Sequence, residues 1–347
     1  MKKNTMMNQA CNLSSGTVVN GKWNGERYTI IRLLGQGATG NVYLADSRKG
    51  KVALKLSENS MAITSEVNVL KRFSKVQGTS LGPSLLDVDD WRIDHGKILP
   101  FYVMEYVRGK NFLEFIKDRG IEWVDVLVLQ LLSNLERLHQ QGWIFGDLKP
   151  ENLLISGPPP RIRCIDVGGT TQQGRAIKEF TEFFDRGYWG FGTRKAEPSY
   201  DLFSVAMIMI NAAYPKRFTR KSESDGRAQL FDIIDHHPFL QKHRQVLQKA
   251  LLGKYMNAAE MKRDLVHLLS IETSKEKQKT KTYRTQVKTQ SHTKSQAARM
   301  GPSQVKQTRK QAKQTKKRKK MSGVLETIVI LIGVFLIYSL YVYHYLM

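Results

Sequence analysis

The sequence predicts an α+β fold that is followed by a disordered basic linker and a C-terminal transmembrane helix. Residues 25–271 have ordinary globular composition, and strand-like alternation at their start gives way to helix-like spacing. Residues 272–320 carry 17 Lys or Arg against two acids, which accounts for most of the formal net charge of +24. Residues 325–347 contain one acid, Glu326, and no Lys or Arg. These shifts in composition divide the chain.

Residues 1–24 are predicted to form an N-terminal extension, because they are polar and lack the apolar core of a signal peptide. The chain contains only two cysteines, Cys11 and Cys164. They lie far apart in the sequence, which argues for a reducing compartment and against both a disulfide scaffold and a cysteine metal site.

The linker, residues 272–320, consists mainly of Lys, Gln, Thr and Ser, with Tyr283 as its only aromatic residue. Such a segment cannot bury enough apolar area to offset the entropy of ordering, so we expect it to be disordered. From Thr327 onward, 21 residues contain no Asp, Glu, Lys or Arg. As a helix they would be roughly 31 Å long, which spans a bilayer. A buried core helix is the alternative, but this segment is apolar on every face.

The basic cluster KKRKK at residues 316–320 precedes the predicted span. Because basic flanks stay in the cytoplasm, we expect a tail anchor in the cell membrane with residues 1–320 on the cytoplasmic side. The tyrosine-rich end of the segment suits the membrane interface.

The first strand-like segments, residues 27–35 and 35–45, flank a glycine-rich turn. Its glycines have the spacing G-x-G-x-x-G and are Gly35, Gly37 and Gly40. Glycines allow a backbone hairpin to lie close over phosphates without Cβ clashes. A dinucleotide-binding turn has the same spacing, but that turn opens a helix, whereas Val42 and its neighbours favour a strand.

Lys55 belongs to the segment VALK on the next predicted strand, residues 51–57, where its ammonium can reach phosphates under the glycine loop. A helix is predicted from about Ile63 to Phe73 and carries Glu66, eleven residues after Lys55. We expect the Glu66 carboxylate to hold the Lys55 ammonium in place. The alternative is a surface pair between Glu66 and a basic residue on its own helix.

An apolar strand, FYVME, ends at Glu105 and leads through a connector into a helix. Such a connector presents the backbone N–H and C=O groups of Glu105 and Val107 to a planar base, with Met104 behind it. A second helix, residues 121–140, then delivers the chain to the loop GWIFGDLKPENLL at residues 142–154.

The ordered series of glycine loop, VALK, MEYVRG, DLKPENLL and IDVGG resembles the eukaryotic-type (Hanks) serine/threonine protein kinases of bacteria over residues 25–271. It looks most like a membrane-anchored kinase of a spore-forming bacillus. The resemblance implies a two-lobed fold, with a small mainly β N-lobe and a larger mainly α C-lobe. It also implies ATP and Mg²⁺ as cofactors, phosphoryl transfer to Ser or Thr of protein substrates, and autophosphorylation.

The resemblance assigns roles to the quoted loop and to IDVGG. Asp147 matches the catalytic aspartate, which accepts or orients the proton of the substrate hydroxyl, and Lys149 matches the lysine that neutralises the transferring phosphoryl group. Asn152 and Asp166 match the two residues that hold Mg²⁺. The remaining nucleotide contacts that it implies are Leu34, Val42, Ala53 and Leu154 around the adenine, with the glycine loop, Lys55, Glu105 and Val107.

The sequence also departs from the family pattern. The usual H-R-D is Phe145-Gly146-Asp147, so the arginine that grips a phosphorylated activation loop is missing. The D-F-G phenylalanine is Val167. The A-P-E motif is not recognisable, although Asp201 resembles the buried helix aspartate that braces the catalytic loop. The candidate autophosphorylation sites are Thr170, Thr171, Thr181 and Thr193.

Two other functions remain open on the sequence. Gly146-Asp147 resembles a pair found in small-molecule phosphotransferases, and a pseudokinase scaffold would use the linker to recruit DNA or anionic lipid. The complete glycine loop and DLKPEN favour a protein kinase over the first alternative. The intact set of polar residues argues against the second; this set is Lys55, Asp147, Asn152 and Asp166.

The basic residues of the linker suit salt-dependent binding to phosphate backbones, and we hypothesise that residues 272–320 bind DNA. Attachment to anionic lipid is the alternative. It suits residues 316–320, but the basic residues begin too far from the span for topology alone to explain them. Crowding of several chains on one DNA would then activate the kinase through self-association and trans-autophosphorylation.

Overall fold

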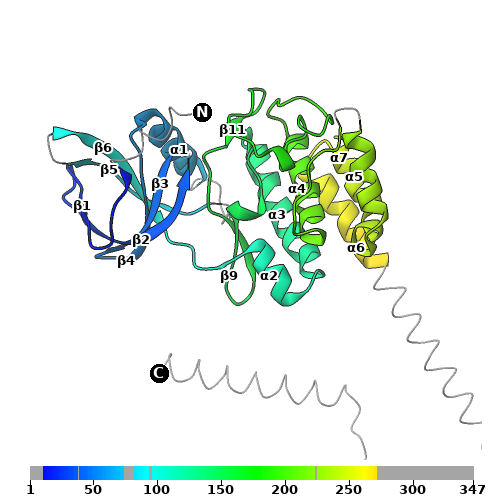
Figure 1. The fold of residues 1–347 in the computed structure, drawn as a ribbon, viewed down its shortest axis with the longest axis horizontal. Coiled ribbons are helices and arrows are strands. Elements are labelled where there is room, and N and C mark those ends of the chain that lie inside the picture. The colour runs from blue at the N-terminus through cyan, green and yellow to red at the C-terminus, as the bar shows by residue number, and fades with distance from the viewer. Residues whose placement is uncertain (1–10, 38, 74–81, 94–95, 223–224, 272–347) are drawn as a thin grey trace, which may run out of the picture. The chain divides into compact units, whose positions relative to one another are not determined.

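A computed structural model describes residues 11–37, 39–73, 82–93, 96–222 and 225–271. The chain divides into two units, Met1–Thr282 and Tyr283–Met347, and every described residue belongs to the first. In this unit one lobe contains the long strands β2 to β6 with helix α1, and the other contains α2 to α7 with only short strands (Figure 1). This arrangement confirms the predicted α+β, two-lobed fold.

The predicted linker (272–320) and transmembrane helix (325–347) lie outside the described residues. Within the part of the chain that the structure does describe, no helix is both long enough and apolar enough to cross a membrane.

The N-lobe is built on a six-stranded sheet in which all neighbouring strands are antiparallel. In sheet order the strands are β1 (Val18–Asn20), β2 (Arg27–Gly37), β3 (Gly40–Ser47), β4 (Gly50–Leu56), β6 (Ile98–Glu105) and β5 (Leu85–Arg92). One face of the sheet buries an apolar cluster that includes Ile30, Tyr43 and Leu54. Helix α1 (Ser60–Phe73) packs against β5 and β6.

Residues 11–24, which the sequence places in an N-terminal extension, are part of this lobe. β1 pairs with β2, and both Cys11 and Val19 are completely buried. The buried carboxylate of Asp89 on β5 accepts a hydrogen bond from the Trp23 N–H (3.0 Å) and so attaches the segment to the opposite edge of the sheet. Periodicity alone did not reveal these strands, because β1 has three residues and β5 carries three acids whose partners are distant in sequence.

Helix α1 begins at Ser60, before the start that the sequence predicts near Ile63. The reason is Asn59, whose Oδ1 accepts a hydrogen bond from the Ala62 N–H (3.1 Å) and caps the helix. Glu66 belongs to the buried face of this helix. A carboxylate is rarely buried without a partner, so its position points to an ion pair inside the lobe.

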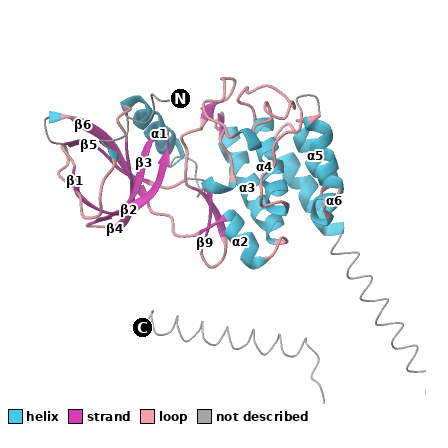
Figure 2. Ribbon diagram, viewed as in Figure 1, coloured by secondary structure: helices cyan, strands magenta, loops and turns pink. Residues whose placement is uncertain are grey.

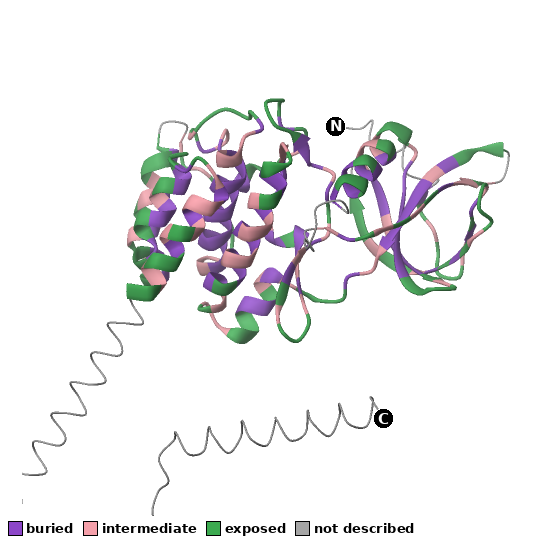
Figure 3. Ribbon diagram, turned by 180° about the vertical axis from the view of Figure 1, so that it is seen from behind, coloured by how far each residue is buried: buried purple, intermediate pink, exposed green. Residues whose placement is uncertain are grey.

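The C-lobe is mainly helical (Figure 2). Its helices are α2 (Phe112–Arg119), α3 (Trp123–Gln140), α4 (Pro198–Ala213), α5 (Gly226–Asp235), α6 (Pro238–Lys242), α7 (Arg244–Leu251) and a further helix over residues 258–271. Every residue of α4 from Tyr200 to Ala212 is buried, and the buried segments gather inside this lobe (Figure 3). A helix that is covered on all sides is a fixed support for the loops around it.

Two small antiparallel sheets carry those loops. In the first, β9 (Leu153–Ser156) lies between β10 (Arg161–Cys164) and β7 (Lys110–Asn111); in the second, β8 (Trp143–Ile144) pairs with β11 (Thr171–Gln172). The catalytic loop, residues 145–152, connects β8 to β9 and ends in a 3-10 turn. The activation segment, residues 166–197, begins just after β10 and ends at α4. Both loops therefore start from strands of the same two sheets.

Candidate active site

The predicted ion pair between Lys55 and Glu66 is present in the N-lobe. Lys55 Nζ on β4 lies 2.7 Å from Glu66 Oε2 on α1, and both side chains are almost fully buried. Glu66 Oε2 also accepts a hydrogen bond from the Tyr102 hydroxyl (2.7 Å), while Lys55 Nζ donates to Thr39 Oγ1 (2.9 Å). Burial and the Glu66 charge raise the pKa of Tyr102 well above its usual range, so this hydroxyl remains a donor. Glu66 thus faces the sheet and not the basic residues of its own helix.

The predicted catalytic aspartate, Asp147, forms a closed triangle with two other side chains. Its Oδ2 accepts a hydrogen bond from Lys149 Nζ, and its Oδ1 accepts one from the Thr181 hydroxyl (2.9 Å). Lys149 Nζ also donates to Thr181 Oγ1 (3.0 Å). The sequence singles out Thr181 only as a phosphorylation candidate, because nothing in its local pattern marks a partner of a residue 34 positions away.

One backbone hydrogen bond places the two predicted magnesium ligands near each other. The Ile165 N–H donates to the Asn152 C=O (3.0 Å), so Asp166 follows directly beside the end of the catalytic loop. The buried Asn152 side chain donates through Nδ2 to the Asp147 C=O (3.0 Å), whereas the Asp166 side chain is exposed. No group of three or more His, Cys, Asp or Glu side chains among the described residues is arranged around one metal position. Two oxygen ligands suit Mg²⁺, which takes its remaining ligands from phosphates and water.

A further carboxylate, Glu179 of the activation segment, lies in the same region. A Cβ atom on Gly168 would lie 3.3 Å from Asp166 Oδ1, 3.3 Å from Glu66 Oε1 and 3.5 Å from Glu179 Oε2, so these three carboxylates lie near one another. Burial and the charge of Asp166 raise the pKa of the half-buried Glu179. Sequence reasoning did not single out Glu179, because no motif contains it.

Asp201 of α4 braces the catalytic loop, as the sequence predicts. Its Oδ2 accepts hydrogen bonds from the Phe145 N–H (2.8 Å) and from His139 Nε2 (2.8 Å), and its Oδ1 accepts one from the Gly146 N–H (2.9 Å). The Asp201 side chain is completely buried. Because it holds two consecutive backbone amides, it fixes the path of the chain immediately before Asp147.

The absence of the family's arginine from the catalytic loop has a structural explanation. Gly146 has a φ of +85°, and a Cβ atom there would lie 2.6 Å from the Gly169 carbonyl oxygen. A Cβ atom on Gly169 would in turn lie 2.9 Å from the Asp147 Cβ. The catalytic loop and the start of the activation segment therefore pack backbone against backbone, and an arginine at position 146 does not fit.

Ion pairs within the activation segment hold its second half. The buried Asp185 accepts hydrogen bonds from Arg194 Nε (2.8 Å) and from the Tyr200 hydroxyl of α4 (2.9 Å). The buried Arg186 lies 2.7 Å from Glu197. Sequence reasoning missed this network. The signal that could have found it is the run FFDRGYWGFG, which sets two charged residues inside an aromatic stretch.

The residues predicted to contact the nucleotide fit a base and phosphates. Val107 is buried, and neither its N–H nor its C=O has a hydrogen-bond partner among the described residues, so both are available to a planar base. Gly40 must be glycine, because its φ is +136° and a Cβ atom would lie 2.4 Å from the Leu56 carbonyl oxygen. A Cβ atom on Gly35 would meet no protein atom within 4 Å, and one on Gly37 would make only an ordinary contact at 3.8 Å. Protein atoms therefore do not crowd Gly35 and Gly37.

The four apolar residues predicted around the adenine lie on both lobes. Ala53 belongs to an apolar cluster that also contains Met104, and Leu34 and Val42 pack against it. Leu154 lies on β9 of the C-lobe, opposite Arg163 of β10. Their contact with adenine stays a prediction.

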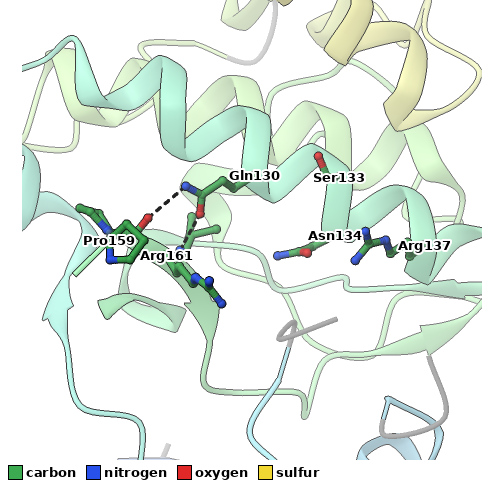
Figure 4. Close-up of a pocket in the computed structure, with 8 residues that line it drawn as sticks. Gln130, Ser133, Asn134, Arg137, Pro159 and Arg161 are labelled. Atoms are coloured by element: carbon green, nitrogen blue, oxygen red, sulfur yellow. Dashed lines mark hydrogen bonds between the residues drawn. The ribbon is translucent and has the colours of Figure 1, made fainter. Parts of the chain in front are cut away.

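A separate pocket lies on the C-lobe, between α3 and the segment that joins β9 to β10 (Figure 4). Its volume is about 330 Å³, and it is lined by Gln130, Ser133, Asn134, Arg137, Pro159, Pro160, Arg161 and Ile162. None of the predicted site residues lines this pocket, so it is distinct from the proposed nucleotide site.

Comparison with known proteins agrees with this geometry. The family model of the protein kinase domain matches residues 28–309. The chain belongs to the protein kinase family. The kinase is 48% identical to serine/threonine-protein kinase YabT of Bacillus subtilis over 347 residues, which cover the whole of both chains. It is 30% identical over 203 residues to the probable serine/threonine-protein kinase CPE1738 of Clostridium perfringens, covering 54% of this chain and 29% of that protein.

Among solved structures, the kinase matches vaccinia related kinase 3 with a TM-score of 0.56 and 17% identity, covering 76% of this chain and 92% of the other. This likeness supports the fold alone. The sequence matches go further: the chain is a bacterial eukaryotic-type (Hanks) serine/threonine protein kinase that transfers phosphoryl groups from ATP. Use of ATP and Mg²⁺ is general in this family, and protein substrates follow from its activity. The matches favour this function over a small-molecule phosphotransferase or a pseudokinase scaffold.

The kinase exposes its four candidate threonines to different degrees. Thr170 and Thr171 are buried, at 0% and 1% exposure. Thr181 is half-buried and bonded to Asp147, whereas Thr193 is exposed. Of these four, Thr193 is the one that another kinase molecule can reach without rearranging the activation segment.

Proposed function

We propose that this kinase binds ATP and Mg²⁺ between its lobes and phosphorylates Ser or Thr hydroxyls beside Asp147. The observation that carries the proposal is the triangle of Asp147, Lys149 and Thr181. The Thr181 hydroxyl lies within hydrogen-bond distance of both other side chains, so a group of the same chemistry as the acceptor fits between them. Geometry of this kind is the first requirement for a residue that accepts or orients the proton of an attacking hydroxyl.

Each side chain then has a defined task. Asp147 accepts or orients the proton of the acceptor hydroxyl, and Lys149 places a positive charge where negative charge develops. Lys55, oriented by Glu66, is directed toward phosphate oxygens, and Asn152 and Asp166 provide the protein ligands for the metal. When bound, ATP with Mg²⁺ supplies the transferable phosphoryl group and offsets its charge.

We also propose that the kinase is a tail-anchored protein of the cell membrane. The apolar segment 325–347 would span the bilayer, and residues 1–320 would face the cytoplasm, because basic residues immediately precede the span. The resemblance to a kinase of spore-forming bacilli suggests sporulation as the process that it serves.

The basic linker, residues 272–320, is proposed to bind DNA and to activate the kinase by gathering several copies on one DNA. Its 17 Lys or Arg support binding that weakens steeply as salt rises. Activation by crowding suits a catalytic loop in which Gly146 replaces the arginine of a phosphate clamp. Exposed Thr193 is the proposed target of the resulting trans-autophosphorylation.

The test is transfer of labelled phosphate from ATP with Mg²⁺ by the full-length kinase, its Asp147→Asn variant and an Asp118→Asn control. Asp118 is a matched carboxylate on the surface of α2, so its replacement is expected to leave transfer unchanged. Loss of the proton acceptor is expected to lower the rate by about 10²–10⁴-fold. If the Asp147→Asn variant transferred phosphate at the wild-type rate, the proposed function would be wrong.

The same assay, repeated with duplex DNA or anionic vesicles at low and high salt, tests the linker. Stimulation by DNA that disappears at high salt and in a variant lacking residues 272–320 is the expected result. Stimulation that survives removal of these residues contradicts the proposal, and stimulation by vesicles alone assigns the linker to the lipid surface.

A further inference from the structure

Glu105 and Arg163 form a two-pronged ion pair that connects the lobes. Glu105 ends β6 two residues before Val107, and Arg163 lies on β10 three residues before Asp166. Arg163 Nη1 donates to Glu105 Oε1 (3.1 Å), and its Nη2 donates to Oε2 (2.8 Å). A planar guanidinium that meets a carboxylate through two bonds fixes direction as well as distance.

Three further hydrogen bonds attach this pair to the neighbouring backbone. Arg163 Nη2 donates to the Gly82 C=O (3.2 Å), the Ser84 N–H donates to Glu105 Oε2 (3.2 Å), and the Glu105 N–H donates to the Ser84 C=O (2.9 Å). The hydrogen bond from Arg163 lowers the pKa of the Glu105 carboxyl, so the pair is ionised at neutral pH. Only 14% of the Arg163 side chain is exposed, and water therefore screens it less than a surface charge.

The two ends of the pair lead to different parts of the proposed nucleotide site. Beyond Glu105 lies Val107, whose buried backbone groups have no partner among the described residues. Beyond Arg163, β10 ends at Cys164, and the chain reaches Ile165, whose N–H donates to the Asn152 C=O (3.0 Å), and then Asp166. The pair thus joins the base-binding connector to the strand that positions both proposed metal ligands.

We propose that Arg163 is a positioning residue that couples binding of the adenine base to binding of the metal ion. This inference rests on the proposed function, which assigns the base to Val107 and the metal to Asn152 and Asp166. Arg163 acts through Glu105: it keeps the connector at a fixed position relative to Asp166. When the ion pair between Glu105 and Arg163 is loosened, the base site and the metal site bind their parts of the nucleotide independently. An adenine at the base site then no longer raises the affinity for the metal ion. Lysine cannot replace this arginine, because an ammonium keeps the charge but loses the fork.

The experiment measures the Kd of ADP, with and without Mg²⁺, by titration calorimetry on the full-length protein. The variants are Arg163→Lys, Glu105→Gln and the two combined, with Arg161→Lys as the matched control. Arg161 lies on the same strand, and its side chain is exposed and makes no ion pair with Glu105. We expect each single variant to reduce the magnesium-dependent gain in ADP affinity about fivefold or more, whereas the control keeps the wild-type gain. The double variant is expected to lose no more than one single variant, because the two side chains act as a unit.

A purely structural role for Arg163 would give a different result. It would lower the melting temperature and weaken ADP binding equally with and without Mg²⁺, which would overturn the proposal. The proposal would also be overturned if Arg163→Lys kept the magnesium-dependent gain in ADP affinity of the wild type. It would be overturned likewise if Mg²⁺ did not raise the ADP affinity of the wild-type kinase. The phosphate-transfer assay separates the two claims: if transfer still depends on Asp147, only the coupling has failed. If wild-type protein neither binds ADP nor transfers phosphate, the proposed function has failed.

Discussion

The catalytic loop and the activation segment are each organised around a completely buried carboxylate, but the partners of the two carboxylates differ. Asp201 receives hydrogen bonds from two backbone N–H groups and from His139. Asp185 also accepts two backbone hydrogen bonds, from the Gly187 and Tyr188 N–H groups, but it is paired with Arg194 and bonded by the Tyr200 hydroxyl. Tyr200 and Asp201 are adjacent on α4, so one turn of this central helix holds both segments.

The difference lies in how far the partners can move. The groups bonded to Asp201 are all buried, and so the core fixes the catalytic loop. The Arg194 side chain is 44% exposed, which lets the ion pair at Asp185 open toward water without leaving the arginine unsolvated. The comparison therefore assigns a rigid support to the catalytic loop and an adjustable one to the activation segment.

Replacing Asp201 by Asn tests the rigid support and is expected to have the largest effect. The amide keeps the shape of the side chain. Its NH₂ group, however, would face an N–H group that now donates a hydrogen bond to the carboxylate, and both buried groups would be left without an acceptor. We expect a loss of roughly 2–4 kcal/mol in the free energy of unfolding. Phosphate transfer is expected to fall about 10²-fold, because the backbone before Asp147 shifts.

Urea denaturation and the phosphate-transfer assay measure these two effects. The control is Asp118→Asn, which replaces an exposed carboxylate and is expected to change neither the free energy of unfolding nor the rate of transfer. If Asp201→Asn unfolds and transfers phosphate like the wild type, the buried carboxylate does not brace the loop.

Replacing Asp185 by Asn tests the adjustable support, where a smaller effect is expected. The Tyr200 hydroxyl and the Gly187 N–H can still donate to the remaining Oδ1, and the released Arg194 side chain can turn to solvent. Only the half-buried Tyr188 N–H, which donates to Oδ2 (2.9 Å), loses its acceptor. We expect a loss of about 1–2 kcal/mol in the free energy of unfolding, again measured in urea. The loss should shrink as salt rises, because the ion pair that is removed is partly exposed. A loss greater than that of Asp201→Asn would reverse the comparison.

The sequence predicted those parts of the site that depend on fixed, short spacings. Lys55 and Glu66 lie eleven residues apart in a strand and the next helix, and their predicted ion pair is present at 2.7 Å. The brace from Asp201 followed from the resemblance to a family with that residue at that place. The two-lobed fold followed in the same way, from the order of the motifs.

The sequence could not predict contacts that join distant segments without a motif. Thr181 and Asp147 are 34 positions apart, and Arg163 and Glu105 are 58 positions apart. Asp89 of β5 holds Trp23, which is why residues 11–24 belong to the N-lobe and not to an extension. The departure at Gly146 was visible in the sequence, but its cause was not, because only the fold brings Gly169 against it.

Replacing Glu179 by Gln sharpens the comparison at the point where the activation segment approaches Asp166, and it is expected to have the smallest effect. Burial and the charge of Asp166 raise the pKa of Glu179, so its ionised form is less favourable in the folded than in the unfolded kinase. Above the raised pKa the wild type carries this cost in full. Below the ordinary pKa of a glutamate, about 4.3, both states are protonated and the cost disappears.

We therefore expect Glu179→Gln to melt roughly 1–3 °C above the wild type at neutral pH, with a gain that shrinks as the pH falls. Scanning calorimetry between about pH 4.5 and pH 8 measures it. Glu182 is an exposed carboxylate of the same segment, and Glu182→Gln is expected to show no gain because water already solvates that group. A gain that stays constant with pH would mean that Glu179 acts through packing and not through its charge.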